Sequence, residues 1–370
     1  MSYWQNFKRK TVAGVCCGAM CLQLSSGIVL PTKAEAFDIG NAMGALIGTA
    51  VQYEFLNKQL NYLDNDGRQE YFEQMKQQIG VADNEQRHEM LGNIIAKLSA
   101  AIAQSDPSIN DKPYNYFVNK ETTYNAFCSA GHNISVNTGM FDLVNDREDE
   151  LAIVIAHEMG HGQKDHVLKG VKKSMPLDLL TNLYQSQNPN AVSIIGAKIL
   201  NNSIHATQMT KPQEIEADNL AFDYTVKAGY NVGAGAATWQ RFIDKMGESK
   251  GNFIGDLFSP SDHPSHQSRR DSYSAKLTDY SNGNIKVDSK TGLIKIKDKD
   301  FIIPVSMDTM SSQERSYLIA GNLAAVYHNS ATQSEATYDG ETIYIGTQAI
   351  MTPLAGEDGP AIVVKLNGFR

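Results

Sequence analysis

The sequence predicts an α+β protein that is mainly helical, with a small antiparallel β-sheet and a small α+β domain at the C-terminal end. Three observations lead to this prediction. Apolar residues recur at helical spacing over most of residues 37–104 and 148–280. Short alternating or β-rich segments cluster between residues 114 and 140, split by Gly131 and Gly139. The composition changes after the turn-rich stretch DYSNGN, which ends at residue 284.

The N-terminal segment, residues 1–36, has the composition of a signal peptide. Basic residues 8–10 precede the apolar run 11–30, and Ala-Glu-Ala at 34–36 supplies small residues at the spacing of a cleavage site. We expect an exported chain that begins near Phe37 and resides in the periplasm, in the cell envelope or outside the cell. The alternative is an uncleaved anchor, because the apolar run is long enough to span a bilayer. Membrane attachment would then depend on this segment alone.

Composition narrows the class of protein. The 370 residues are 42% hydrophobic with a net charge of −8, which suits a protein with a sizeable core and argues against a nucleic-acid-binding role. Three of the four cysteines lie in the predicted signal peptide, so only Cys128 would remain and no intramolecular disulfide could form. We interpret Cys128 as a small, half-buried residue and not as a nucleophile.

The patterns divide the mature chain into two domains, residues 37–279 and 284–370. No internal repeat is apparent. In the first domain helices are expected at 37–60, 68–78 and 84–104, from 146–149 through the histidine pair, at 213–229 and 236–246, and near 271. In the second, we expect a hairpin at 285–305, a helix at 311–328, and strands near 342–346 and 361–366.

The sequence HEMGHGQKDH, residues 157–166, contains the pattern HExxH. Residues four apart lie on one face of a helix, so His157 and His161 can present two imidazoles to one metal ion. Glu158 is rotated by about 100° from His157, where it can take a proton from a water without binding the metal. A pair of ordinary surface histidines would also produce this pattern, so a third ligand is needed to decide.

A catalytic zinc ion needs three protein ligands and one open position. In the metzincin pattern the third histidine follows six residues after the second, but here that position is Val167 and His166 misses it by one. We therefore expect His166 to be a hydrogen-bonding neighbour or a helix-end residue. The better ligand is Glu214, 214 − 161 = 53 positions beyond His161, with Asp218 one turn further on to hold the distal nitrogen of a ligating histidine. A solvated charged face would also explain this second helix.

The two motifs together resemble those of a known peptidase family. The segment from Asn125 to His166 and the segment EIEADNLAFDYTVKAGY resemble peptidase family M48, which includes HtpX, the CAAX prenyl proteases and soluble exported relatives. The resemblance covers about residues 50–275. It implies a zincin-type metallopeptidase domain, with His157, His161 and Glu214 as ligands of one zinc ion, Glu158 as catalytic base and Asp218 behind a ligand. Lys211 stands where the family often has arginine.

Two further features bear on the expected site. We predict that the strand segment containing Asn125, Ala126, Phe127, Asn133, Ile134 and Ser135 forms an edge beside the cleft and pairs with an extended peptide, although these strands could also be plain core sheet. The stretch from His263 to Arg269 matches the HP-four-residues-R pattern of the soluble relatives. His263 is a candidate to stabilise the oxyanion or to plug the open zinc position, and a structural loop is the alternative.

The sequence thus predicts a zinc metalloendopeptidase that cleaves proteins of the cell envelope, in protein quality control. The main alternative is a latent or inactive protease-like chaperone or assembly factor that holds unfolded envelope proteins in its groove. A purely structural metal site is disfavoured, because such sites normally have four protein ligands and Cys128 has no cysteine partner. We expect a protein or peptide substrate and no nucleic acid. Residues 284–370 show no recognisable chemistry, and three roles are open for them: binding an envelope protein partner, binding the envelope or gating the cleft.

Overall fold

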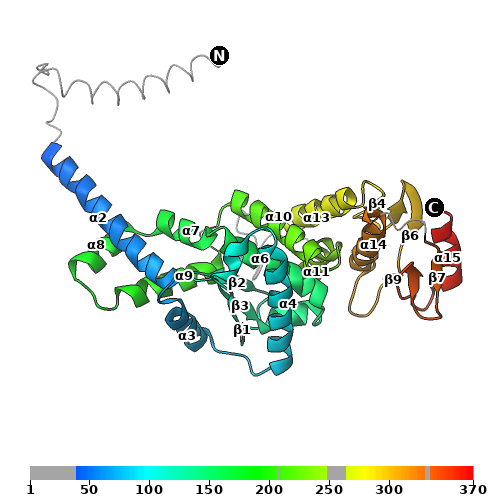
Figure 1. Cartoon of the computed structure of the whole chain (residues 1–370), viewed down its shortest axis with the longest axis horizontal. Coiled ribbons are helices and arrows are strands. Elements are labelled where there is room, and N and C mark those ends of the chain that lie inside the picture. The colour runs from blue at the N-terminus through cyan, green and yellow to red at the C-terminus, as the bar shows by residue number, and fades with distance from the viewer. Residues whose placement is uncertain (1–38, 207–208, 248–263, 330–333, 370) are drawn as a thin grey trace, which may run out of the picture. The chain divides into compact units, whose positions relative to one another are not determined.

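The structure is a computed structural model that describes residues 39–206, 209–247, 264–329 and 334–369, with side chains from Gly48 onward (Figure 1). The chain divides into two units, residues 1–51 and 52–370, and the description below concerns the second. The predicted signal peptide and His263 lie outside the described residues.

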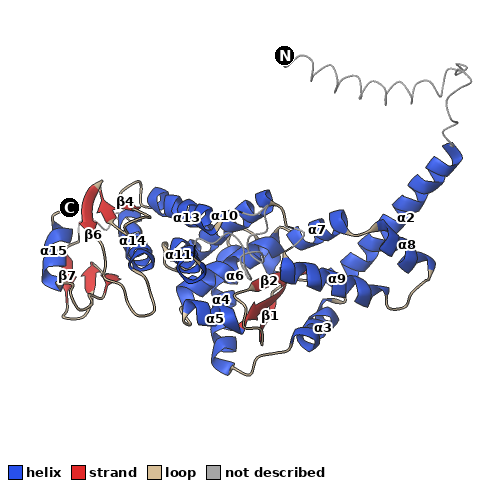
Figure 2. Cartoon of the chain, turned by 180° about the vertical axis from the view of Figure 1, so that it is seen from behind, coloured by secondary structure: helices blue, strands red, loops and turns tan. Residues whose placement is uncertain are grey.

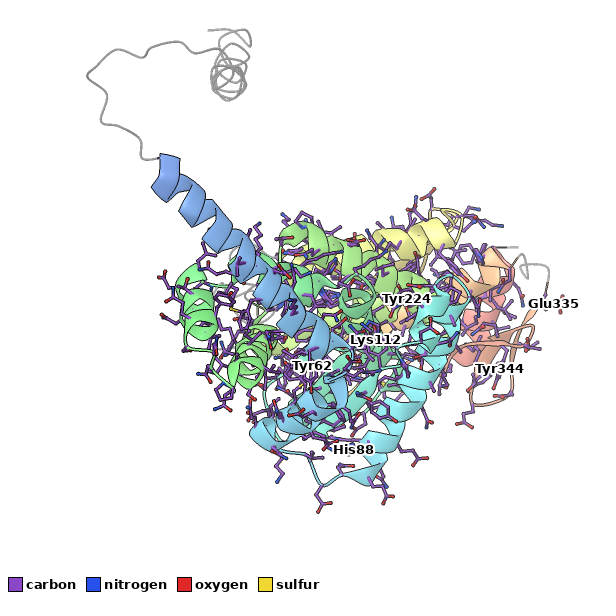
Figure 3. All side chains as sticks on the ribbon, turned by 60° about the vertical axis from the view of Figure 1, so that its left-hand side comes forward. Tyr62, His88, Lys112, Tyr224, Glu335 and Tyr344 are labelled. Atoms are coloured by element: carbon purple, nitrogen blue, oxygen red, sulfur yellow. The ribbon has the colours of Figure 1, made fainter. Side chains whose placement is uncertain are left out.

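The first part of the fold is a set of helices, as predicted: α2 (Ile39–Asp64), α3 (Arg68–Ile79), α4 (Glu85–Ala103) and the 3-10 helix η1 (Pro107–Asn110). Asn84 caps α4 by accepting the backbone N–H of Arg87 at 3.1 Å. The end of α2 is fixed to the sheet region, because Asp64 pairs with Lys112 at 2.5 Å and accepts the N–H of Gly131 at 2.9 Å (Figure 3 labels Lys112).

The small sheet comprises β1 (Asn115–Asn119), β2 (Ala126–Ser129) and β3 (Asn133–Asn137), in the order β1-β3-β2. β2 and β3 form an antiparallel hairpin, but β1 pairs with β3 in parallel, so the predicted antiparallel sheet is in fact mixed. The hairpin occupies one edge of β3. Residues 120–125 connect the end of β1 to the start of β2, which lies at the opposite edge of β3. β1 therefore occupies the remaining edge of β3 and runs parallel to it.

The two faces of this sheet contribute to different hydrophobic cores. Successive side chains in a strand point to opposite faces. Accordingly Ile134 and Cys128 belong to a core with the helix that carries His157, whereas Phe117 and Phe127 belong to a second core with α2 and α3. Cys128 is 2% exposed, so it is fully buried and not half-buried as expected. Only one face of the sheet therefore packs against the helix that carries His157.

The helices that follow complete the predicted peptidase region: α5 (Thr138–Val144), α6 (Glu148–Gln163), α7 (His166–Ser174), α8 (Leu177–Gln185), α9 (Ala191–His205), α10 (Lys211–Lys227), α11 (Ala234–Met246) and α13 (His266–Tyr280). Figures 1 and 2 show α6 inside this group, with α10 and β2 beside it. Among the described residues, no helix is both long and apolar enough to cross a bilayer.

The C-terminal region contains a structural repeat, so the expectation of no internal repeat is wrong. The strands β4 (Ile285–Val287), β5 (Ile294–Ile296) and β6 (Lys299–Ile302) precede α14 (Ser312–His328), and β7 (Ala336–Tyr338), β8 (Ile343–Ile345) and β9 (Gln348–Met351) precede α15 (Gly359–Asn367). Each strand triplet is an antiparallel sheet with a register shift at the start of its middle strand.

The first turns of the two halves are also alike. Asp288 accepts the backbone N–H groups two and three residues ahead, at 3.0 and 2.9 Å, and Asp339 does the same at 2.9 and 2.7 Å.

The prediction of a strand near residues 361–366 is wrong. Asp358 caps a helix there by accepting the N–H of Ala361 at 3.0 Å, and Ile362 and Leu366 face the core at helical spacing.

The repeat region and the peptidase region share one hydrophobic core. Tyr317 and Leu323 of α14 pack in the same cluster as Phe242 of α11 and Tyr273 of α13. The contact is close, because a Cβ atom at Gly233 would lie 1.8 Å from the carbonyl oxygen of Tyr317. The predicted boundary at residues 279–284 covers the end of α13 and the turn before β4, and the division into separate domains remains a prediction.

Candidate metal centre and active site

Helix α6 carries the HExxH motif through the interior. Glu148, Asp149 and Glu150 occupy its first turn, where carboxylates interact favourably with the helix dipole. Every residue from Glu150 to Gly162 is buried, including His157 and His161, which lie one turn apart on the same face. The hypothesis of two ordinary surface histidines is therefore wrong.

Helix α10 supplies the acidic side of the site. Gln213 accepts the backbone N–H of Thr210 at 2.9 Å, and Pro212 occupies the first turn, so the helix start is well specified. Gly160 of α6 lets the two helices approach closely, since a Cβ atom there would lie 3.3 Å from the Cα atom of Ala217. This contact brings Glu214, 4% exposed, against the histidine pair.

The three predicted ligand side chains converge on one point. The Nε2 atoms of His157 and His161 are 3.0 Å apart, and each lies 3.4 Å from a carboxylate oxygen of Glu214. Zinc binds nitrogen and oxygen ligands at about 2.0–2.1 Å, so tetrahedral ligands are separated by about 3.3 Å. The arrangement fits a metal ion of this kind, and among the described residues these three are the group able to hold one.

The outer nitrogen of His157 is held by Asp218. The carboxylate Oδ1 lies 3.0 Å from Nδ1 of His157, so Nδ1–H donates to Asp218 and leaves Nε2 for the metal. Arg269 binds the same carboxylate through Nε at 2.8 Å and through Nη2, and its Nη2 also lies 3.0 Å from Nδ1 of His157. Both nitrogens are donors, so their proximity reflects a shared acceptor in Asp218 and not a hydrogen bond between them.

Comparisons with known proteins agree with this geometry. Residues 85–275 match the model of peptidase family M48. The chain is 30% identical over 261 residues to Metalloprotease LoiP of Escherichia coli strain K12, covering 67% of this chain and 87% of the relative. The chain belongs to peptidase family M48. It is therefore a metallopeptidase, and the predicted family is confirmed.

Two other M48 relatives match a smaller part of this chain. The mitochondrial metalloendopeptidase OMA1 of Arabidopsis thaliana is 31% identical over 42% of this chain, and the putative beta-barrel assembly-enhancing protease of Vibrio cholerae is 24% identical over 65%. The chain spans 30% and 47% of these two relatives, respectively, so their whole length is not represented here.

In the M48 site Glu158 lies beside the ligands and is 7% exposed. Its Oε2 accepts the backbone N–H of Cys128 at 2.9 Å, which fixes the carboxylate against strand β2. Burial raises the pKa of Glu158 to about 7, against the smaller lowering effects of His157 and the Cys128 N–H. A carboxylate with a pKa near neutral is suited to take and return a proton.

The two acidic neighbours of His157 determine its protonation preference, whereas burial outweighs Glu214 and lowers the pKa of His161. Burial lowers the pKa of His157, but the hydrogen bonds to Asp218 and Glu214 outweigh burial and raise it to about 9. Burial also raises the pKa of Asp218, but Arg269 and His157 outweigh that and lower it. The site therefore favours a cation close to its two carboxylates, which is the preference expected of a metal centre.

Asn125, Ala126 and Phe127, three of the predicted substrate-binding residues, line the cavity beside His157, His161 and Glu214, and their role in binding substrate stays a prediction. The other predicted substrate residues, Asn133, Ile134 and Ser135, lie on the central strand β3, fully buried and paired on both sides. They have no free backbone edge, so they cannot pair with a peptide. The edge-strand hypothesis is therefore restricted to β2.

One residue has a larger role in the site than the sequence pattern indicates. Arg269 was recognised only as part of the His263 pattern, whereas it is 3% exposed and clamps Asp218, with Tyr273 donating to the same carboxylate at 3.2 Å. His166 is a hydrogen-bonding neighbour, with its Nδ1 2.9 Å from Nδ1 of His161. Lys211, the departure from the family pattern, is exposed at the start of α10.

Proposed function

We propose that this M48 protein is a zinc-dependent metalloendopeptidase. The observation that carries the proposal is the convergence of His157, His161 and Glu214 at tetrahedral spacing, with the buried carboxylate of Glu158 beside them. His157, His161 and Glu214 would hold the ion. Bound zinc would polarise a scissile carbonyl and lower the pKa of a water. Glu158 takes the proton of the attacking water and returns it to the leaving amine.

Strand β2 is the surface on which an extended substrate would lie. The carbonyl of Asn125 accepts the N–H of Asn137, so the backbone of residues 125, 127 and 129 points toward β3. The backbone groups of Ala126 and Cys128 alternate with these and point away from β3. The Cys128 N–H already binds Glu158, so β2 leads directly to the catalytic base. Pairing of a peptide with Ala126 would place its backbone across the metal site.

The substrates we propose are proteins of the cell envelope, cleaved in quality control. The signal-like segment at residues 1–36 supports export, and one relative is named as a beta-barrel assembly-enhancing protease. We further propose that residues 284–370 bind an envelope protein partner. Cell fractionation, and capture of substrates by the Glu158→Gln variant in envelope extracts, test these proposals.

The central test is Glu158→Gln, with zinc content and peptide hydrolysis measured on the same preparation. We expect about one zinc ion per chain in both proteins and a loss of hydrolysis of about 10²–10⁴-fold in the variant. Glu121→Gln, on an exposed glutamate, is the matched control and should change neither quantity. Equal activity of Glu158→Gln and parent in protecting unfolded envelope proteins, without hydrolysis by either, would instead favour the chaperone hypothesis.

A further inference from the structure

His166 lies directly behind the ligand His161. It begins α7 and is 2% exposed. Asp165, just before it, has a left-handed backbone with φ of 52°, and this bend turns the chain back toward α6. As a result the rings of His161 and His166 are 5.1 Å apart at an angle of 68°, with their Nδ1 atoms 2.9 Å apart.

The metal geometry fixes the direction of this hydrogen bond. His161 points Nε2 toward His157 and Glu214, so its Nε2 is the ligand atom. A neutral imidazole that binds through Nε2 carries its proton on Nδ1. His161 therefore donates to Nδ1 of His166. The proton of His166 is then on Nε2, which lies 3.3 Å from Oε2 of Glu216.

We propose that His166 is a positioning residue for the metal, which accepts the Nδ1–H of His161 and, with Glu216, fixes the tautomer and ring orientation of that ligand. The inference rests on the proposed zinc site. It gives His161 the support that Asp218 gives His157. Glu216 lies two residues after Glu214, so helix α10 would supply a ligand to the ion and also the last member of the chain that orients His161.

The test is zinc affinity, measured by competition with a coloured chelator in the Glu158→Gln background to avoid self-cleavage. His166→Leu keeps the apolar volume but removes the acceptor, and should weaken zinc binding about 10–100-fold. His166→Asn keeps an acceptor near the Nδ1 position and should restore most of the affinity. The cobalt-substituted proteins should show the same order, with an altered ligand-field absorption spectrum in His166→Leu alone.

His132→Asn is the matched control. His132 is also buried, its Nδ1 binds the carbonyl oxygen of Lys112 at 2.8 Å, and asparagine tolerates its left-handed φ of 54°. It should leave zinc affinity unchanged. Parent-like affinity and cobalt spectrum in His166→Leu would overturn the inference.

A second variant decides the question if His166→Leu does not fold. Glu216 is half exposed, so Glu216→Ala should fold, and it should weaken zinc binding by less than His166→Leu is expected to. Parent affinity in Glu216→Ala would then overturn the inference. A parent protein that binds no zinc would refute the proposed function itself, and the inference would fail with it.

Discussion

Replacing Arg269 with methionine should destabilise the protein strongly, through a charge left without its partner. Arg269 binds Asp218 with two nitrogens, its guanidinium carbon lies 3.7 Å from the centre of the Trp239 ring, and both members of the ion pair are at most 5% exposed. In Arg269→Met the carboxylate of Asp218 keeps His157 and Tyr273 as its donors among the residues that the structure describes. Removing one partner of a buried pair costs about 3–5 kcal/mol.

That free-energy cost can be converted to a change in melting temperature. The unit from residue 52 to residue 370 has 370 − 52 + 1 = 319 residues. At about 2.1 cal/mol/K per residue its unfolding entropy is about 0.67 kcal/mol/K, so the melting temperature should fall by about 4–8 °C. The assay is thermal unfolding at pH 7.5 with a chelator present, so that metal binding does not contribute to the difference.

The pH dependence follows from the same carboxylate. In the parent, Arg269 holds the pKa of Asp218 below its usual value despite burial. Without Arg269, burial is opposed mainly by His157, so we expect the pKa of Asp218 to rise in the folded variant. A carboxyl whose folded pKa is raised contributes stability at low pH and loses it as pH rises through the folded pKa. The destabilisation should therefore be smaller at pH 5 than at pH 8.

Two comparisons separate this explanation from simple loss of packing. Adding Asp218→Asn to Arg269→Met removes the unpaired charge and should recover part of the stability, whereas a cavity effect would remain. Lys286→Met breaks a solvent-exposed pair with Asp298 and should change the stability little. If the melting temperatures of Arg269→Met and Lys286→Met differ by less than 1 °C at both pH values, the reasoning is refuted.

Three further predictions concern the site. The acidic limb of kcat/KM should lie between the ordinary glutamate pKa and about 7, because Glu158 must be ionised to act as a base; activity that stays constant from pH 4 to 8 would contradict this. Ala126→Pro should raise KM for peptides with little change in melting temperature, because its N–H points away from β3; unchanged kinetics would argue against the β2 edge. Burial raises the pKa of the Cys128 thiol well above its usual value, so site-resolved mass spectrometry should find it unalkylated in the folded protein and alkylated in denaturant.

The proposed ligand set could be predicted from the sequence because its geometry is local. The four-residue spacing of His157 and His161, and of Glu214 and Asp218, places each pair on one helix face whatever the rest of the fold. Only the meeting of the two helices needed the family pattern. The contact of Arg269 with Asp218 was harder to predict, because the two residues are 269 − 218 = 51 positions apart and such a separation produces no periodic pattern.

Other features depend on tertiary structure that spacing does not encode. The parallel pairing of β1 with β3 depends on the path of residues 120–125, and its residues would suit either direction. The helix at Gly359–Asn367 has a β-branched composition, and capping by Asp358 outweighs that local preference. The C-terminal repeat is hidden because the two halves agree in strand order and turn chemistry while differing in most residues.

The close approach of α14 to Gly233 has a consequence for how this enzyme can be shortened. A chain ended at residue 283 would lose Tyr317 and Leu323 and expose the apolar side chains of Phe242 and Tyr273 to solvent. Such a surface promotes aggregation. A minimal peptidase that ends at residue 283 should thus be recovered from inclusion bodies, and soluble expression should require the first C-terminal repeat.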